Sequence, residues 1–521
     1  MTKRESRSLN TIRNSIASII YNVFNIILSF ILQSYFIKIL GVEYNGIKSL
    51  FLNILSMLSI IELGFGSAII YNLYSPIQNK DNERVKQLLG FYKLIYNIIS
   101  LIILLIGLCL MPFLDALVGE NSIQDNIYII YILYLLNTVS SYLLTYKRSV
   151  LYANQHNYII NIFDTIFLII RTIIQILILK FIGNIYIFII IQILSTLFEN
   201  ICISIFVNKK YSYLVTKKHT NNIDEDTKKD IFKKVKGLLF HKIGSFIVTG
   251  TDNILISTAP NLGIVYVGLY SNYNMIIYNV SLILNNIMNS ATSSIGNLLS
   301  VEKKYEKKII QTYNSITLVN SWMYCLCGSI MLAIIEPFIS IWLGKEFLLP
   351  NTVLIVLIIN FYINGMKKTS DIFKTAAGIF YEDRFVPIIE SIFNIAFSLI
   401  FLKFCGLSGI FLGTICSSFV LLFYSYPKYM YSKIIDKSIS KYFYLILKHT
   451  CISFFSFFIV YIICKFVTIR NIYLLLIAKF LISFLVPNII YFAFMFKSDD
   501  FKYLIKILLD VLKKRKEKVS I

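Results

Sequence analysis

Apolar runs long enough to cross a lipid bilayer recur along the whole chain and leave little sequence between them. A helix needs about 20 predominantly apolar residues to span the hydrocarbon layer. Of the 521 residues, 57% are hydrophobic and only 15% are charged. The sequence therefore predicts an all-α, polytopic membrane protein, and a count of soluble domains from chain length does not apply to it.

The runs divide into about fourteen expected transmembrane helices. They lie near 14–40, 45–73, 88–114, 126–151, 157–181, 184–207, 237–258, 262–299, 309–341, 350–374, 385–404, 407–427, 442–466 and 471–496. The longest polar connection, 208–236, has mixed charge and is typical of a surface linker. We expect it to join an N-lobe of six spans, 1–207, to a C-lobe of six spans, 237–433. The segment 434–521 then adds two further spans and a basic tail.

One short passage occurs twice in similar form, with the same Gly, Tyr, Gly and Ser at matching positions and Phe51 matched by Tyr273. Gly41–Phe51 reads GVEYNGIKSLF, and Gly263–Tyr273 reads GIVYVGLYSNY. The alternative explanation is chance. Internal repeats of hydrophobic segments are typical of transporters, whose halves move about a central site. Because the two copies are six spans apart, an even number, both enter the membrane from the same side. We therefore expect parallel repeats related by an axis along the membrane normal.

Basic residues predict the orientation of the spans. The chain has 50 Lys and Arg against 28 Asp and Glu. They concentrate in alternate connections and in the tail, as the positive-inside rule requires if both termini are cytoplasmic. The excess positive charge is then a topological signal that also attracts anionic lipid, and nucleic acid is not an expected partner. The first apolar run is too long for a cleaved signal and is interpreted as a signal-anchor.

The eight cysteines lie in the expected spans without metal-ligand spacing, and the four histidines are scattered. No nucleophile elbow, phosphate loop or zinc motif occurs in the sequence. We therefore expect no enzyme activity, no metal and no cofactor.

Several apolar motifs in a fixed order resemble the polysaccharide transporter (Wzx-type flippase) family. In the first half they are Leu40–Gly46 (LGVEYNG), Glu62–Ile69 (ELGFGSAI), Leu73–Pro76 (LYSP) with Asp81, and Phe91–Tyr96 (FYKLIY). In the second half they are Thr251–Ser257 (TDNILIS), Gly268–Tyr273 (GLYSNY), Ser294–Leu298 (SIGNL), Pro337–Gly344 (PFISIWLG) and Gly409–Thr414 (GIFLGT). The resemblance covers most of residues 10–430, and the order of the motifs is more specific than any one of them.

The resemblance implies the MATE/MOP superfamily fold and a function. It implies a flippase that moves undecaprenyl-pyrophosphate-linked oligosaccharide units from the inner to the outer leaflet by alternating access, without ATP, for capsule or O-antigen synthesis. The implied location is the bacterial cytoplasmic membrane. The implied partners are the lipid-linked oligosaccharide, membrane lipids and a polysaccharide polymerase.

Cations inside the spans are candidates for binding the pyrophosphate, since charges within a bilayer are costly and mark functional sites. We assign Arg171, Lys242 and Arg148 to this role, because an arginine fork suits phosphate oxygens. Each has a structural alternative. Arg171 can pair with Asp164, seven residues earlier on the same helix face, Lys242 can snorkel to the interface, and Arg148 can be a topology signal.

Three acidic residues are candidates for ion coupling or for structural bracing. They are Asp164, Asp252 and Glu62. Export of a pyrophosphate is electrically downhill from an inside-negative cell, and return of the empty carrier can be coupled to H⁺ or Na⁺. For the sugars we assign Asn272, Tyr273 and Asn286 to a polar cavity. The competing explanation is that Asn and Tyr are enriched throughout the chain, as an AT-rich genome produces.

Two other functions remain open. A MATE-type drug exporter shares the architecture, but such proteins use an acidic residue in the first span, and this chain has none there. A membrane glycosyltransferase or polysaccharide polymerase would need a sizeable outer loop, whereas the expected outer loops are short.

Overall fold

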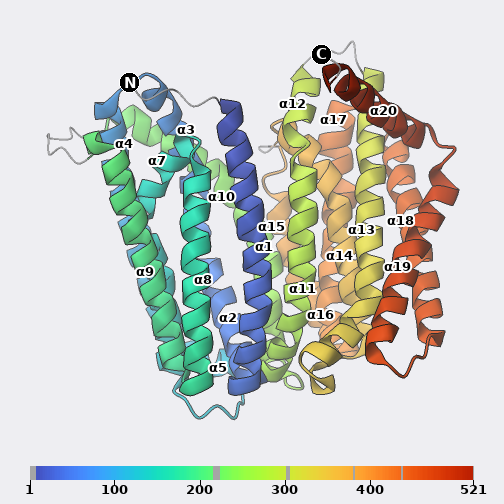
Figure 1. Ribbon diagram of the computed structural model, residues 1–521, viewed down its shortest axis with the longest axis horizontal. Helices are drawn as coiled ribbons and strands as arrows, with labels where there is room; N and C mark the ends of the chain where they lie inside the picture. The colour runs from blue at the N-terminus through green and yellow to red at the C-terminus, as the bar shows by residue number, and fades with distance from the viewer. Residues whose placement is uncertain (1–6, 215–222, 301–305, 380–381, 436–437, 520–521) are drawn as a thin grey trace. The chain divides into compact units, whose positions relative to one another are not determined.

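The computed structural model describes residues 7–214, 223–300, 306–379, 382–435 and 438–519, apart from a few side chains inside helices. The described residues are almost entirely helical, and no strand occurs among them (Figure 1). The chain forms two compact units, Met1–Ser271 (unit 1) and Asn272–Ile521 (unit 2). The predicted all-α fold is thus confirmed, while the lobe boundaries expected at the 208–236 linker stay predictions.

The helices of unit 1 come in the following order. They are α1 (Arg7–Leu40), α2 (Val42–Leu58), α3 (Ile60–Gln78), α4 (Asn82–Leu110), η1 (Met111–Phe113), α5 (Leu114–Val118), α6 (Ile127–Tyr142), η2 (Thr145–Lys147), α7 (Arg148–Ala153), α8 (Asn157–Phe181), α9 (Ile185–Lys210), η3 (Ser212–Leu214) and α10 (Glu225–Thr258). The next helix, α11 (Gly263–Asn289), begins in unit 1 and continues into unit 2.

Unit 2 continues with a second series of helices. They are α12 (Thr292–Ser300), α13 (Glu306–Trp342), η5 (Lys345–Phe347), α14 (Asn351–Ala376), α15 (Val386–Cys405), α16 (Leu407–Val420), η6 (Leu421–Tyr431, a π-helix), α17 (Ser432–Ile434), α18 (Ile439–Phe466), α19 (Ile472–Met495) and α20 (Asp499–Val519).

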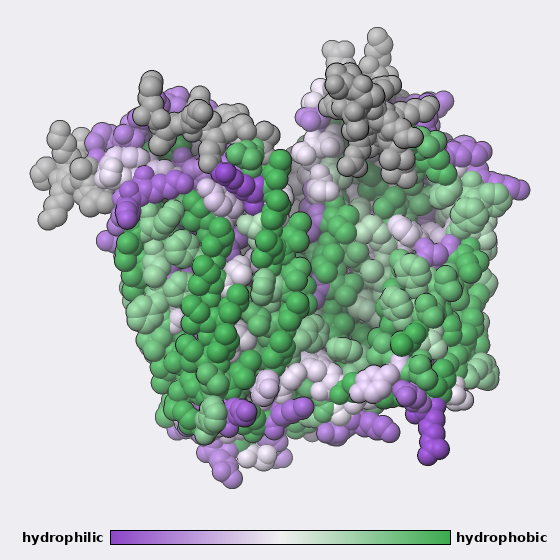
Figure 2. Space-filling model, viewed as in Figure 1, coloured by the Kyte–Doolittle hydropathy of each residue, from purple (hydrophilic) through white to green (hydrophobic). Residues whose placement is uncertain are grey.

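Each of the fourteen expected spans coincides with one helix or with consecutive helices. Ten helices in the described part of the chain are long and apolar enough to cross a membrane. The other four expected spans coincide with α2–α3, α10, α11 and α14, and three of these contain charged residues such as Lys48, Asp252 and Lys367. Figure 2 shows that the helices of each unit carry an apolar outer surface that gives way to polar residues at their ends.

Capping residues explain where several helices begin. The side chains of Asp81, Asn126, Asn184 and Asn471 accept hydrogen bonds from backbone N–H groups in the first turns of α4, α6, α9 and α19, which satisfies donors that a helix N-terminus leaves unpaired. Asp224 caps α10 in the same way.

Asp224 also joins α10 to α4, because it accepts a hydrogen bond from Arg84 at 2.5 Å. Hydrogen bonds from Thr227 and Arg84 hold the pKa of the Asp224 carboxyl well below its usual range.

The two copies of the repeated passage pack against each other. A Cβ on Gly46 would lie 2.2 Å from the backbone oxygen of Ile264, and a Cβ on Gly268 would lie 2.2 Å from that of Val42. Val42 and Ile264 occupy the same place in the two copies, as do Gly46 and Gly268. The contact between α2 and α11 is therefore reciprocal, as a pseudo-twofold axis produces. We call it the glycine crossing.

The last two spans are fixed to unit 2 by buried hydroxyl groups. Helix α13 packs against α14, α18 and α19. Ser321 Oγ lies 2.8 Å from the hydroxyl of Tyr362 and 2.6 Å from that of Tyr491, and Ser453 Oγ lies 2.7 Å from the Tyr491 hydroxyl. All four residues are buried, so the cluster joins one residue from each of these four helices.

Replacing Tyr491 by phenylalanine is expected to lower the free energy of unfolding by about 1–3 kcal/mol, because the buried hydroxyl groups of Ser321 and Ser453 each lose a hydrogen-bond partner. Thermal unfolding in detergent measures the change. Tyr444→Phe is the control, since Tyr444 on α18 is exposed. Equal stability of the two variants would show that the cluster does not fasten α19.

Candidate functional site

The site in unit 1 begins where the fourth expected span is broken. Helix α6 ends at Tyr142, and Leu144 adopts a φ of 65°, which is uncommon for a residue with a side chain. The chain then forms the short helices η2 and α7. The break places Arg148 in the first turn of α7, which packs against α3, α8 and α9.

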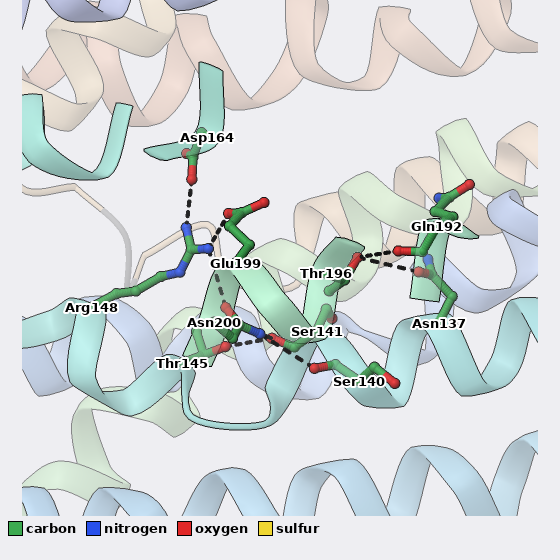
Figure 3. A network of polar contacts seen from close by, with 10 residues as sticks. All are labelled: Asn137, Ser140, Ser141, Thr145, Arg148, Asp164, Gln192, Thr196, Glu199 and Asn200. Carbon is green, nitrogen blue, oxygen red and sulfur yellow. Dashed lines mark hydrogen bonds and ion pairs between the residues drawn. The ribbon is translucent and has the colours of Figure 1, made fainter. Parts of the chain in front are cut away.

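Arg148 connects α7 to the two helices that follow it (Figure 3). Its Nη1 donates to Asp164 Oδ1 of α8 at 2.9 Å. Its Nη2 donates to the carboxylate of Glu199 and, at 3.2 Å, to Asn200 Oδ1, both on α9. The side chains of Arg148, Asp164 and Glu199 are 17%, 22% and 18% exposed. The planar guanidinium thus holds two carboxylates from different helices in one plane of donors.

Arg171 on α8 lies near this cluster. Its electrostatic neighbours are Glu199 and the hydroxyl of Tyr21 on α1. The Nε atoms of Arg171 and Arg148 are both buried without a hydrogen-bond partner among the described residues. Together the two arginines balance Asp164 and Glu199 in formal charge. The cluster therefore is electrically neutral and still has two unused N–H donors.

A cavity of about 430 Å³ opens beside Arg148, within the size range of small-ligand sites. Its lining combines charged, hydroxyl and amide groups with one aromatic face from α4. The lining residues are Glu62, Gly66, Ile70, Tyr96, Ser141, Thr145, Arg148, Ser149, Tyr152, Thr196, Glu199 and Asn200. All of them belong to unit 1, so the cavity is a property of that unit.

Hydrogen bonds order the polar wall of the cavity. Asn200 Nδ2 donates to the backbone oxygens of Ser140 and Ser141, at 3.4 Å each, where α6 ends. Thr196 Oγ1 donates to Asn137 Oδ1 at 3.4 Å and to the backbone oxygen of Gln192 at 3.0 Å. The carboxylate of Glu62 on the opposite wall bonds to the hydroxyl of Tyr142.

Four of the nine site residues predicted from the sequence come together here. Arg148 and Glu62 line the cavity, Asp164 bonds to Arg148, and Arg171 neighbours Glu199. Asp164 is thus the partner of Arg148, from another helix, whereas the sequence had suggested a pair with Arg171 on its own helix. The prediction that these residues serve transport stays a prediction.

The other five predicted residues lie away from the cavity or cannot be placed. Asp252 of α10 is buried, with Oδ1 unpartnered among the described residues. Asn272 and Tyr273 are fully buried in unit 2, where the Tyr273 hydroxyl accepts a hydrogen bond from Leu349 N at 2.9 Å. Asn286 is exposed. The side chain of Lys242 lies outside the described residues.

Charged residues within the spans of unit 2 form pairs of their own. Lys374 of α14 pairs with Asp383, which also accepts a hydrogen bond from Ser425 at 2.9 Å. Lys367, two turns earlier, bonds to Glu390 of α15 at 3.3 Å and to Ser418 of α16 at 3.1 Å. A basic residue on the tenth expected span therefore bonds to the eleventh and twelfth spans in unit 2, as Arg148 on the fourth span bonds to the fifth and sixth spans in unit 1.

Sequence reasoning gave no role to Asn200, Glu199 or Lys48, although all three are polar residues inside expected spans. A polar residue inside an apolar span is a signal that the sequence offered for each of the three. The bonds between helices that make Glu199 and Asn200 part of one cluster could not be predicted from it, because they depend on the break after α6.

Comparison with known proteins adds independent findings. Residues 11–292 match the protein family described as polysaccharide biosynthesis protein. No curated protein sequence matches the chain.

Solved structures are similar over most of the chain. The lipid II flippase MurJ in an inward closed conformation is 18% identical, with a TM-score of 0.66, over 93% of this chain and 98% of that one. An inward-facing multidrug resistance MATE family transporter of the MOP superfamily is 13% identical, with a TM-score of 0.60, over 79% and 95%. A mutant of the Vibrio cholerae MATE transporter VcmN is 16% identical, with a TM-score of 0.57, over 84% and 99%. At these identities the likeness concerns the fold.

Proposed function

Because the chain belongs to the polysaccharide biosynthesis protein family, we propose that it is a flippase for a lipid-linked saccharide. Its MurJ-like and MATE-like fold supports a transporter that changes conformation around its substrate. The substrate that fits best is an undecaprenyl-pyrophosphate-linked oligosaccharide, carried from the inner to the outer leaflet of a bacterial cytoplasmic membrane. A polysaccharide polymerase is the reaction partner that would use such a product.

The observation that carries this proposal is the pair of half-buried arginines with buried Nε atoms, one of which, Arg148, lines a polar cavity. An unpaired N–H donor in a low-dielectric region is costly, and Arg148 and Arg171 each keep one within the described part of the chain. Phosphate oxygens are strong acceptors for guanidinium groups. We expect the pyrophosphate to reach these donors and to compete with Asp164 and Glu199 for them.

The carboxylates then give the site a way to release its ligand. When the phosphate leaves, Asp164 and Glu199 recover both arginines, so no bare cation is left in the membrane. This exchange keeps the charge of the empty site balanced. Lys242, which the sequence places near the start of the seventh span, is proposed as a first contact for the phosphate.

The membrane potential supplies part of the driving force. Moving one negative charge outward across an inside-negative membrane is favourable by roughly 2.3 kcal/mol per 100 mV. Asp252 is proposed as the acid that couples the return step to H⁺ or Na⁺, since it is a buried carboxylate with one oxygen that has no partner among the residues that the structure describes. Asn272, Tyr273 and Asn286 stay candidates for contacts to sugar during transport.

Replacing Arg171 by glutamine is expected to lower the flipping rate by about 10- to 100-fold, the value of one charge-assisted hydrogen bond. The test uses purified protein in liposomes that contain a labelled undecaprenyl-pyrophosphate oligosaccharide, and a lectin outside the vesicles reports the sugar. Lys180→Gln is the control, because Lys180 lies on the same helix and is exposed. Equal rates for wild type and Arg171→Gln would remove the arginine site.

One observation favours a second function, export of organic cations by a MATE-type mechanism. The cavity is lined by two carboxylates, Glu62 and Glu199, and by one cation, Arg148. A lining with this balance also attracts positive charge. Proton- or sodium-driven uptake of a cationic dye into the same liposomes distinguishes the two functions, and a flippase should show none. A glycosyltransferase or polymerase activity would instead lengthen the sugar, which mass spectrometry of the lipid detects.

A further inference from the structure

A chain of hydrogen bonds runs from a half-buried lysine, Lys48, to the glycine crossing. Lys48 Nζ of α2 donates to Gln33 Oε1 of α1 at 2.7 Å. Gln33 Nε2 donates to Asn45 Oδ1 at 2.8 Å. Asn45 Nδ2 donates to the backbone oxygen of Gly268 at 3.0 Å and to Ser271 Oγ at 2.6 Å. The chain thus links α1, α2 and the part of α11 that belongs to unit 1.

Chemistry fixes the direction of every bond in this chain. An ammonium group only donates, so Gln33 must turn its oxygen toward Lys48 and its NH₂ toward Asn45. A backbone carbonyl only accepts, so Asn45 must turn its NH₂ toward Gly268. Both ends therefore impose the same orientation on the two amides, although amide orientation is otherwise ambiguous. Removing the donor at one end removes half of this constraint.

The Lys48 ammonium is held by its hydrogen bond to Gln33 and by one aromatic ring. Its Nζ lies 4.2 Å from the centre of the Phe36 ring, a cation–π contact. No ion pair with a carboxylate is found for it in the described part of the chain. A half-buried lysine inside a span, whose charge is balanced by an amide oxygen and a ring rather than by an acid, is costly to keep, which points to a use for its charge.

The last hydrogen bond of this series lies where the two repeat copies meet. Gly268 is the residue whose missing side chain allows the backbone of Val42 to approach, and its carbonyl is the acceptor for Asn45. The bond therefore joins α2 to α11 at the point of closest approach. A contact between two helix backbones is either fully packed or separated, because packed interfaces have two discrete states and do not deform continuously.

We infer that Lys48 is a positioning residue, whose ammonium orders Gln33 and Asn45 so that Asn45 holds the two repeat copies together at the glycine crossing. It touches no substrate. The inference concerns the stability of this contact and does not need the proposed flippase function. It rests on that function only in its consequence, that the contact opens and closes during transport.

The test measures amide hydrogen exchange in the wild-type protein and in Lys48→Met, both in nanodiscs without substrate. We expect the peptides that cover 41–50 and 262–272 to exchange about tenfold faster in Lys48→Met, the effect of losing one charged hydrogen bond on local opening. Lys48→Arg keeps the donor and should stay close to wild type. Lys38→Met, a change at an exposed lysine of α1, should have no effect.

A second variant removes the middle hydrogen bond of the series, between Gln33 and Asn45. Gln33→Glu gives Lys48 a carboxylate partner but removes the N–H donor to Asn45, so exchange in 262–272 should rise as in Lys48→Met. Unchanged exchange in that peptide in both variants, or faster exchange confined to 41–50, would overturn the inference.

Transport measurements separate this inference from the proposed function. We expect the maximal flipping rate of Lys48→Met to change while the substrate concentration at half-maximal rate stays within about twofold, as for a residue outside the binding site. If exchange is faster in the variants as expected but the wild-type protein moves no lipid-linked saccharide, the proposed function alone is refuted. An altered half-maximal concentration with unchanged exchange would refute the positioning role alone.

Discussion

Gly268→Val is expected to abolish transport and to destabilise unit 1. A Cβ at this position would lie 2.2 Å from the backbone oxygen of Val42, and a backbone atom cannot rotate out of the way as a side chain can. Overpacking of side chains alone costs about 1–3 kcal/mol, so we expect a loss at the upper end of that range or above it. Thermal unfolding in detergent and the liposome flipping assay measure the two effects.

The symmetry of the crossing provides a stringent check. Gly46→Val should have an effect of similar size, because its Cβ would meet the backbone oxygen of Ile264 at the same 2.2 Å. The double variant should cost clearly less than the sum of the single ones, since the helices are already separated after the first change. Additive effects would mean that the two glycines act at separate contacts.

Gly90→Ala is the matched control for both variants. Gly90 lies inside α4, and a Cβ there would meet nothing within 4 Å. Alanine favours a helix over glycine by about 1 kcal/mol, so this variant should be as stable as wild type or more so. A Gly268→Val protein that is as stable and active as Gly90→Ala would show that α2 and α11 do not pack as described.

The sequence was informative about the crossing because its chemistry is local. Gly41 and Gly263 have φ of 98° and 75°, and only glycine takes such values without strain. Gly46 and Gly268 are small because backbones touch. Residues under these constraints repeat in both copies, so a comparison of the chain with itself finds them. Helix positions were likewise predictable, since α8 occupies the expected 157–181 and apolar length decides a span.

The site was only partly predictable, for a different physical reason. Arg148 lies at the end of an apolar run, where a basic residue is usually a topology signal. Its second role depends on the left-handed Leu144 and on α7, which bring it to Asp164 and Glu199. Tyr273 is a residue type that commonly contacts sugars, but in this structure its hydroxyl accepts a hydrogen bond from Leu349 N. Contacts between helices determine whether such a residue has a structural or a functional role, and the sequence alone does not give these contacts.

Arg148→Ala is expected to be the most damaging single change at the site. It leaves Asp164 and Glu199 facing each other between α8 and α9 without the guanidinium that now bonds to both. Removal of one partner from a buried ion pair costs about 3–5 kcal/mol, because the remaining charge stays desolvated. We expect a lower unfolding midpoint in detergent and no flipping in liposomes. Lys93→Ala, which removes an exposed cation from α4, is the control and should change neither.

A triple variant separates the structural role of Arg148 from its proposed role in phosphate binding. In Arg148→Met, Asp164→Asn, Glu199→Gln, all three charges are replaced by neutral side chains of similar size, and such replacements are often neutral for stability. We expect the unfolding midpoint to recover. Flipping should stay absent, because Arg148, one of the two proposed phosphate donors, has gone. Recovered flipping in this variant would show that the cluster only fastens α7, α8 and α9 together, and the phosphate site would then have to lie elsewhere in the protein.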